Sequence, residues 1–525
     1  MSLRVLVTAV VTAVLVARLT RWAYRRRWAL ALRGLPGPPS PSGIFGHFGT
    51  VSFRKFQGWH ATYGPTFKYH GMLGEAHLYT ADTTALHHIV NNSEVYQKAP
   101  LVRYSLIQLV GRGLLALEGE EHTKMRKIMS PAFGVSQIRG LTELFVDKSV
   151  ELRDVWAQES PNDAGWIQVD VLSGLKRMTL DVIGKAGFAY EFHALNAGDE
   201  APTPLGAAFR ELFMTQIGQR PTVVTFLRAK FPLLRYILPG NKRTLNARLT
   251  MDKIGFQLLQ NAKASIASGD KDTERRDLLS LLVKSNMSEE DSHRLSDAEV
   301  IAQLPTFFTA GHETTSTATA WALYALARAP DVQDKLRNEL SAMGTDNPSL
   351  DALNSLPYLE KFVREVMRVH APVAFTSRMV MQDDVIPLGR PYTDTRGVSH
   401  SSIPVRKGLF IRIPVAVVNQ DPWIWGDDAA EFNPDRWDAI PPNASTIPGV
   451  YVQLFTFFGG SHNCIGWRFA LAEIKALVYT LVRAYEVELA VPVEDVDESL
   501  GLIRRPILKS RMGEGPQLPM RLRKI

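Results

Sequence analysis

The sequence has a single cysteine, Cys464, among its 525 residues, so an intrachain disulfide is excluded. A lone cysteine is most often a small hydrophobic residue of the core, and that interpretation stays open at this point. Glycines at positions 459, 460 and 466 permit tight turns and a close approach of the backbone to a flat ligand. A helical pattern over residues 467–485 starts just after the sulfur, and its N-terminus favours a thiolate, the form of cysteine that binds a soft metal.

The sequence also lacks a glycine-rich dinucleotide fingerprint, a flavin-type domain, internal repeats and low-complexity tracts. The chain is therefore not expected to take hydride from a nicotinamide cofactor by itself. With 45% hydrophobic and 22% charged residues, its composition is that of a globular protein whose core is large enough to enclose a cofactor.

Acidic residues and lysine are missing from residues 1–50, which contain seven arginines. These arginines equal the whole net charge of +7, so the remainder of the chain has as many basic as acidic residues. The positive charge therefore belongs to the amino terminus, and no nucleic-acid partner is expected.

Residues 5–17 form an uncharged apolar run that is shorter than the roughly 20 residues a straight membrane-spanning helix needs. Arg4 and Arg18 can snorkel to the membrane surface, and Trp22 and Tyr24 can lie at the interface, which lengthens the usable segment. We therefore expect residues 1–24 to form a membrane anchor. A cleaved signal peptide and an interfacial helix are the alternatives; the positive charge after the run and the lack of a small-residue cleavage site argue against the signal peptide.

Four prolines between positions 36 and 41 end the anchor and predict an extended basic and proline-rich linker over residues 25–41. The catalytic body is expected over residues 42–525. Residues 51–100 mix short β-like runs with helical stretches at 53–63 and 83–90, and residues 141–283 are mostly amphipathic helix. The fold class is therefore mainly α with small β-sheets.

A long helix is predicted from a capping box at Ser296 and Glu299 to the residue before Pro330, with a kink at Pro305. Its interior contains a glycine and several threonines, which weaken a helix and therefore suggest a functional segment. Gly311 is expected to leave room for a diatomic ligand beside the backbone. Glu313 and Thr314 form an acid–alcohol pair that can relay protons; alternatively, the threonine hydroxyl only bonds back to its own helix.

The spacing of Phe457, Gly460, His462, Cys464 and Gly466 resembles the haem-ligand loop of the cytochrome P450 family. The resemblance implies haem b (iron protoporphyrin IX) as the cofactor and Cys464 as the proximal iron ligand. Thiolate ligation favours O–O cleavage and distinguishes oxygenases from oxygen carriers that use histidine. His462 stands where arginine is more usual in the family.

Further segments match the family in the same order along residues 36–525. Gly311, Glu313 and Thr314 match its oxygen-activation motif. His122 and Arg126 lie four residues apart on a predicted helix and match donors to the haem propionates, with His122 in place of the commoner tryptophan.

Two other matches complete the resemblance. Arg378 corresponds to another contact of a haem propionate. Glu365 and Arg368 correspond to a helical pair that the family joins to a later arginine, Arg436, as a structural triad behind the haem. The fold implied is one large haem-enclosing P450 domain preceded by the anchor helix.

The resemblance implies a monooxygenase that inserts one oxygen atom from O2 into a C–H bond, with electrons from NADPH through a separate NADPH–cytochrome reductase. Lys124, Lys127 and Arg468 are candidates for the reductase contact. An isomerase, a peroxide-driven lyase or a haem sensor are the alternatives, but such relatives tend to lose the acid–alcohol pair. The implied location is the endoplasmic reticulum membrane, single-pass, with the catalytic domain in the cytosol.

The stretches that would shape the substrate pocket are largely apolar, which favours a lipophilic substrate. These stretches are residues 101–117, 207–238, 307–311, 372–376 and 499–505. The second of them would form a lid, with phenylalanines at positions 209, 213, 226 and 231. Residues 391–399 resemble fungal members, which suggests terpenoid tailoring, with xenobiotic or fatty-acid oxidation as the alternative.

Overall fold

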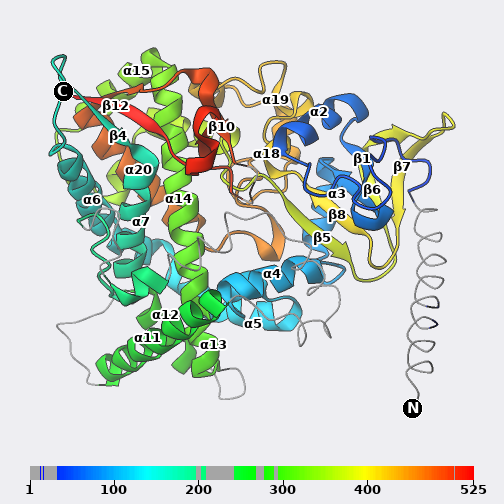
Figure 1. Ribbon diagram of the computed structural model, residues 1–525, viewed down its shortest axis with the longest axis horizontal. Coiled ribbons are helices and arrows are strands. Elements are labelled where there is room, and N and C mark those ends of the chain that lie inside the picture. The colour runs from blue at the N-terminus through cyan, green and yellow to red at the C-terminus, as the bar shows by residue number, and fades with distance from the viewer. Residues whose placement is uncertain are drawn as a thin grey trace. The chain divides into compact units, whose positions relative to one another are not determined.

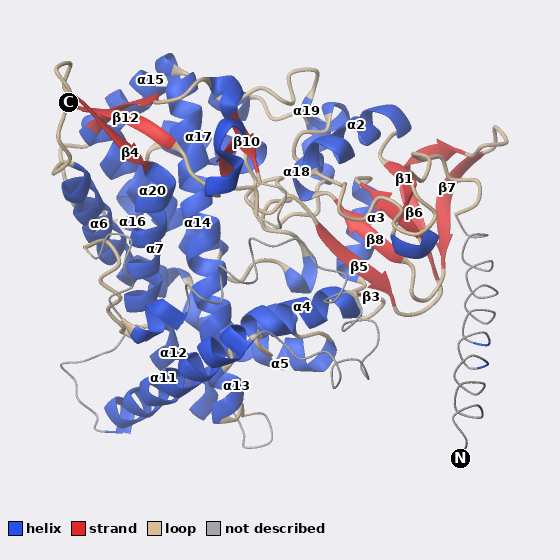
Figure 2. Cartoon of the chain, viewed as in Figure 1, coloured by secondary structure: helices blue, strands red, loops and turns tan. Residues whose placement is uncertain are grey.

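The computed structural model describes residues 32–196, 203–208, 242–267, 277–288, 294–499, 501 and 503–525, together with Thr12 and Val16. The chain divides into two compact units, and each is described by itself (Figure 1). Unit 1 lies within residues 1–99, 375–418 and 446–448, and unit 2 within residues 100–374, 419–445 and 449–525. The expected class, mainly α with small sheets, is confirmed (Figure 2).

Unit 1 is built on a five-stranded sheet with the strand order β1-β2-β8-β5-β3. The strands are β1 (Thr66–His70), β2 (Ala76–Thr80), β8 (Phe410–Ile413), β5 (Thr376–Val380) and β3 (Tyr96–Gln97). The pairing of β2 with β8 is parallel and the others are antiparallel. A separate hairpin joins β6 (Asp384–Thr393) to β7 (Ser399–Val405), and the helices are α2 (Phe53–Tyr63), α3 (Thr83–Asn91) and α18 (Val415–Val418).

Residues 32–37 pack against β1 and are part of unit 1. Leu32 and Leu35 are each only 1% exposed. The Lys68 side chain donates to the carbonyl oxygens of Leu32 and Arg33 at 3.2 and 3.0 Å. The packed body therefore begins inside the segment that was expected to be a linker. The rest of the expected anchor, apart from Thr12 and Val16, lies outside the described residues, and none of the described helices is both long and apolar enough to cross a membrane.

Unit 2 is mainly helical, and its central element is α14 (Gln303–Arg328), which packs against α7 (Val171–Phe188) and α20 (Trp467–Ala484) (Figure 1). The other helices are α4 (Pro100–Val110), α5 (Gly119–Met129), α6 (Val135–Trp156), α11 (Lys242–Ala267), α12 (Leu278–Ser288), α13 (Asp297–Ile301), α15 (Pro330–Ser341), α16 (Leu350–Asn354), α17 (Pro357–Val369) and α19 (Pro422–Trp425). Strands β4 (Trp166–Asp170), β12 (Pro519–Lys524) and β9 (Tyr485–Leu489) form one sheet, and β10 (Val496–Glu498) pairs with β11 (Pro506–Leu508).

The long predicted helix is present but broken. Its capping box at Ser296 and Glu299 is confirmed. The break falls at Ala302, between α13 and α14, three residues before the expected kink at Pro305. Proline has no N–H to bond the carbonyl of Ile301 one turn earlier, so the disruption falls on the preceding turn.

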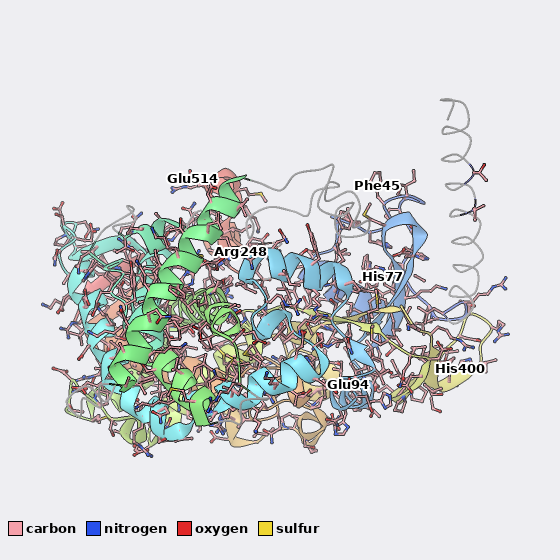
Figure 3. All side chains as sticks on the ribbon, turned by 90° about the horizontal axis from the view of Figure 1, so that it is seen from below. Phe45, His77, Glu94, Arg248, His400 and Glu514 are labelled. Atoms are coloured by element: carbon pink, nitrogen blue, oxygen red, sulfur yellow. The ribbon has the colours of Figure 1, made fainter. Side chains whose placement is uncertain are left out.

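The expected lid falls almost wholly outside the described residues, which include only Ala207 and Ala208 of it. Next to that gap, Arg248 of α11 donates to the carbonyl oxygen of Ile107 on α4 at 2.7 Å, and Figure 3 labels this arginine. The bond connects two helices of unit 2 that are far apart in the sequence.

Candidate functional site

The loop before α20 wraps around Cys464. The Cys464 N–H donates to the carbonyl oxygen of Phe457 at 2.9 Å, and the Asn463 N–H donates to that of Gly460 at 3.3 Å. Gly460 has a φ of +64°, in the left-handed region that favours glycine. Gly466 is the N-cap residue of α20, and its N–H donates to the sulfur. The predicted loop geometry therefore places the thiol at the start of the helix.

The Cys464 side chain is accessible, although protein surrounds it on many sides. Burial raises the pKa of the Cys464 thiol, and this effect exceeds the lowering by the Gly466 N–H and the charge of Arg126. The N–H at the helix start favours the thiolate, as expected, but desolvation opposes the charge more strongly. An accessible thiol in such surroundings fits a site where a bound metal ion stabilises the deprotonated sulfur.

Helix α5 contacts the cysteine loop at two points. The rings of His122 and His462 stack with centroids 4.0 Å apart and an interplanar angle of 13°. The Nε2 atom of His462 lies 2.9 Å from Oε2 of Glu118, the residue that caps α5. The Arg126 guanidinium donates to the main-chain oxygen and to Oδ1 of Asn463, at 2.6 and 2.5 Å. The structure thus brings the predicted residues together, and sequence reasoning did not identify Glu118 as their partner.

One face of α14 is accessible in the middle of an otherwise buried helix. From residue 303 to residue 326, the only positions that are not buried are Ala310, Gly311 and Thr314. The Thr314 hydroxyl donates to the carbonyl oxygen of Ala310 at 2.7 Å, as the structural alternative predicted. This back-bond leaves the oxygen of the hydroxyl on the accessible face as an acceptor.

Gly311 also has a packing role that the sequence did not indicate. A Cβ at this position would lie 2.9 Å from Cδ1 of Ile183 on α7. The side-chain direction of Gly311 is thus filled by Ile183, so the glycine permits two helices to pack closely. Its expected role, leaving room for a diatomic ligand beside the backbone, stays a prediction.

Glu313 is a buried carboxylate held by cations. Its Oε2 accepts from Nε of Arg505 at 2.6 Å, and its Oε1 lies 3.6 Å from Nζ of Lys176. Burial alone would raise the pKa of Glu313, but the charges of Lys176 and Arg505 lower it to about 2. The neighbouring His312 is neutral because burial lowers its pKa, and its Nδ1 lies 2.9 Å from the carbonyl oxygen of Phe308. Glu313 is therefore ionised and bound, not a free neighbour of Thr314.

Sequence reasoning missed Arg505 and Lys176. Arg505 is separated from Glu313 by 192 residues, and it lies in a stretch that was considered only for its apolar side chains. The sequence did contain a signal for a buried ion pair, the adjacent arginines 504 and 505, because arginines in an apolar segment require acidic partners.

The predicted structural triad is present, and two of its three members are fully buried. Glu365 and Arg368 are both 0% exposed and joined by two hydrogen bonds of 2.8 and 2.9 Å. The Nε atom of Arg436 lies 3.6 Å from Oε1 of Glu365, whereas its terminal nitrogens bind the carboxylate of Asp428 at 2.7 and 2.8 Å. The indole N–H of Trp437 donates to Glu365 at 3.1 Å, a contact that the sequence did not indicate.

Arg378 belongs to unit 1, on β5. Its Nη1 donates to Oγ1 of Thr376 at 3.1 Å and to the carbonyl oxygen of Ser377 at 2.9 Å. Its expected role toward a haem propionate stays a prediction.

Comparisons with known proteins agree with this site. Residues 36–510 match the cytochrome P450 family. Two relatives from Postia placenta, cytochrome P450 monooxygenases 205 and 128, are 48% and 46% identical over 93% of this chain and 92% of their own length. Cytochrome P450 monooxygenase claO of Ampulloclitocybe clavipes is 33% identical over 94% of this chain and 93% of its own. The chain belongs to the cytochrome P450 family, and it is a monooxygenase.

The family uses haem as its cofactor, and the residues of unit 2 fit that group. The single accessible thiol supplies a soft ligand, and Arg126 supplies a positive charge beside it. The accessible face of α14 presents uncharged side chains next to an ionised carboxylate.

Proposed function

We propose that this monooxygenase hydroxylates a lipophilic small molecule, with electrons from NADPH delivered by a separate NADPH–cytochrome reductase. The observation that carries the proposal is the accessible face of α14, where Thr314 stands beside an ionised Glu313. Haem, when bound, supplies the activation of O2. The proton transfers that accompany this activation must be carried out by side chains of the protein.

Cys464 would ligate the haem iron in this proposal, and Phe457, Gly460 and Gly466 shape the loop that presents it. His122, Arg126 and His462 would hold the haem propionates. Of these, Arg126 and His462 also tie the loop to α5 through Asn463 and Glu118. These residues orient the cofactor and retain it.

Glu313 acts as a proton acceptor at neutral pH, because Arg505 and Lys176 keep it ionised. To pass a proton toward the accessible face, the carboxylate must first take one from a hydronium ion, which leaves water, and loosen its contact with Arg505. The Thr314 oxygen, an acceptor on the accessible face because its O–H donates to Ala310, orients the water that carries the proton onward.

Replacing Thr314 with alanine is expected to raise the hydrogen peroxide released per NADPH oxidised several-fold, while haem content stays near that of the wild type. The substitution removes a hydroxyl that takes part in proton delivery, whereas the fold does not depend on it. The ratio of peroxide to NADPH is measured with purified NADPH–cytochrome reductase. Thr314→Ser, which keeps the hydroxyl, is the control and should stay close to the wild type. An unchanged ratio in Thr314→Ala would contradict the proton-relay role and support a helix bond alone.

The substrate class that we favour is terpenoid, with xenobiotics and fatty acids as the alternative. An uncharged accessible face on α14 suits a lipophilic molecule. The test is a spectral titration of the holoprotein with diterpenes, sesquiterpenes, fatty acids and aromatic compounds. A low-spin to high-spin shift confined to the terpenes supports the first class, and one confined to fatty acids or aromatics supports the alternative.

We further propose that the amino-terminal segment anchors the protein to the endoplasmic reticulum membrane by a single span, with the catalytic domain in the cytosol. Removal of residues 1–31 should then lower the membrane-bound fraction and leave haem binding and thermal stability unchanged. Removal of residues 1–35 should also lower the melting temperature, because Leu32 and Leu35 are buried and each contributes about 1.5–3 kcal/mol. Cell fractionation and thermal denaturation measure the two effects. Equal melting temperatures would contradict the packing role of these leucines.

A further inference from the structure

Helix α4 is an apolar helix with little of its surface fully buried. Six of its eleven residues are leucine, isoleucine or valine. Every residue of α4 is described, and Val110 is the only one that is buried; the others are half-buried or exposed. A helix of a globular protein normally buries a whole stripe of side chains along its length. The position of α4 therefore depends strongly on the polar contacts at its ends.

The segment that follows α4 lies against α14, one turn before the accessible face. The Leu114 N–H donates to Oε1 of Gln303 at 2.9 Å. A Cβ on Gly113 would lie 2.1 Å from Oγ1 of Thr306, so the main chain at Gly113 is in direct contact with α14. Thr306 precedes Ala310, the first accessible residue of that face, by about one helical turn. Helix α4 itself also packs against α14.

Arg248 of α11 binds the C-terminal end of α4 (Figure 3). Its Nη1 donates to the carbonyl oxygen of Ile107 at 2.7 Å, and the N–H of Gly111 donates to the same oxygen at 3.1 Å. The last four carbonyl groups of a helix lack partners within the helix, and a cation near them interacts favourably with the helix dipole. Arg248 is therefore a C-terminal cap of α4, supplied from 141 residues away in the sequence.

Gly111 is shaped to accept this cap. Its φ of +72° lies in the left-handed region, which favours glycine just after a helix. A Cβ at this position would lie 2.6 Å from Nη2 of Arg248. The guanidinium thus occupies the space that any side chain at position 111 would need. Glycine permits both the turn and the contact with Arg248.

Helix α11 is a firm support for the cap. Lys263 of α11 pairs with Asp297 of α13 at 2.5 Å, and a Cβ on Gly255 would lie 3.0 Å from Cγ2 of Ile301, so α11 and α13 cross closely. Resting on the proposed function, in which a lipophilic substrate lies against α14, we propose that Arg248 is a positioning residue for that substrate. By capping α4 it fixes an apolar surface beside the accessible face, and it thereby sets the affinity for bulky apolar ligands.

The main test compares a small and a bulky ligand of the haem iron in the full-length holoprotein. An imidazole nitrogen ligates haem iron, and the absorption spectrum follows its binding. Arg248→Met has no charge and no donor. It should weaken the binding of an imidazole that carries a triphenylmethyl group several-fold, through faster dissociation, and leave the affinity for free imidazole unchanged. Equal losses for the two ligands, or no loss for the bulky one, would overturn the proposal.

Two further variants separate the cap from a general loss of charge. Arg248→Lys keeps a charged donor and should recover part of the affinity for the bulky ligand. Lys253→Met, at an exposed lysine five residues further along α11, is the matched control and should bind both ligands as the wild type does. A loss of affinity in Lys253→Met as large as that in Arg248→Met would contradict the capping role.

Amide hydrogen exchange keeps the proposal testable if Arg248→Met does not retain haem. Loss of the cap should speed the exchange of the α4 amides in the full-length protein, because the helix then opens more often at its C-terminal end. Lys253→Met, prepared in the same haem-free state, should keep the slower exchange. Equal exchange of the α4 amides in the two variants would overturn the proposal.

Gly111→Ala tests the same contact from the side of α4. Its Cβ displaces the guanidinium, so the affinity for the bulky imidazole should fall as it does in Arg248→Met. The losses should not add in the double variant, because both substitutions break one contact. The strain of alanine at a positive φ lowers the melting temperature in both backgrounds alike and is read separately. Full additivity of the losses in affinity would show that the two residues act independently and would overturn the proposal.

The ligand titrations do not depend on turnover. If the holoprotein binds both imidazoles but oxidises no lipophilic substrate with the reductase, the proposed function fails, and the comparison of the variants still decides the role of Arg248. With a substrate that turns over, Arg248→Met should raise KM several-fold and leave kcat near that of the wild type, because the cap positions the substrate and not the proton relay. A lower kcat with an unchanged KM would contradict the positioning role.

Discussion

Cys464→Ser is expected to abolish monooxygenase activity, even in protein that still contains haem. A neutral serine hydroxyl cannot donate charge to ferric iron as a thiolate does. The absorption band typical of the carbon monoxide complex of a ferrous haem-thiolate protein should disappear as well. Ile465→Val, a conservative change at the adjacent position, should keep both activity and band. Turnover like that of the wild type in a haem-replete Cys464→Ser protein would be incompatible with the ligand assignment.

The same assignment can be tested without turnover. Because Cys464 is the only cysteine, a thiol reagent can label the protein at one position. The thiol is accessible in the protein described here, so haem-free protein should be labelled, whereas bound iron should protect the sulfur in the holoprotein. Equal labelling of the two forms would place the haem elsewhere.

Glu365→Ala is expected to destabilise the protein by about 3–5 kcal/mol, the usual effect of leaving a buried charge without its partner. Arg368 is 0% exposed and cannot reach water. Its remaining acceptors are main-chain carbonyls, those of Asn419 at 3.1 Å, Glu431 at 2.8 Å and Ala429. The indole N–H of Trp437 loses its acceptor at the same time. Urea denaturation followed by circular dichroism measures the change.

Glu488→Ala is the matched control for this experiment, because Glu488 pairs with Arg521 on the exposed surface of the β9–β12 pair. An exposed ion pair contributes about 0–1 kcal/mol. Replacing both Glu365 and Arg368 by apolar residues should recover part of the lost stability, since no charge is then left unpaired. A loss below about 1 kcal/mol in Glu365→Ala would contradict a structural role for the buried pair.

Helix starts were predicted well because the interactions that define them are local. Ser296 and Glu299 form their capping box within one turn, and the predicted bounds of α2 agree with the structure. The kink near Pro305 was misplaced by three residues because the sequence shows where the N–H is missing, but the carbonyl that loses its partner lies one turn earlier.

The motif residues could be found from the sequence since each motif lies within a few positions. Cys464 and its glycines form one loop, and Glu365 and Arg368 occupy one helix face. The residues from distant segments that surround these motifs could not be predicted from short spacings. Burial by distant segments raises the pKa of Cys464 against the effect of the helix N-terminus, and Ile183 from another helix fills the side-chain direction of Gly311.

The sequence by itself determined the class of the enzyme, the single thiol that can ligate a metal, the acid–alcohol pair and the order of the helices, because all of these depend on residue type and short spacing. Only the tertiary structure decided which charged side chains lie within ion-pair distance of each other. Arg505 is 192 residues from Glu313, yet it lowers the pKa of that carboxyl group to about 2 together with Lys176. Burial raises the pKa of the Glu473 carboxyl group on α20 well above its ordinary value. The state of each carboxyl group depends on the distance to a counter-charge and on exclusion of water, and both are set by packing between segments remote in the chain.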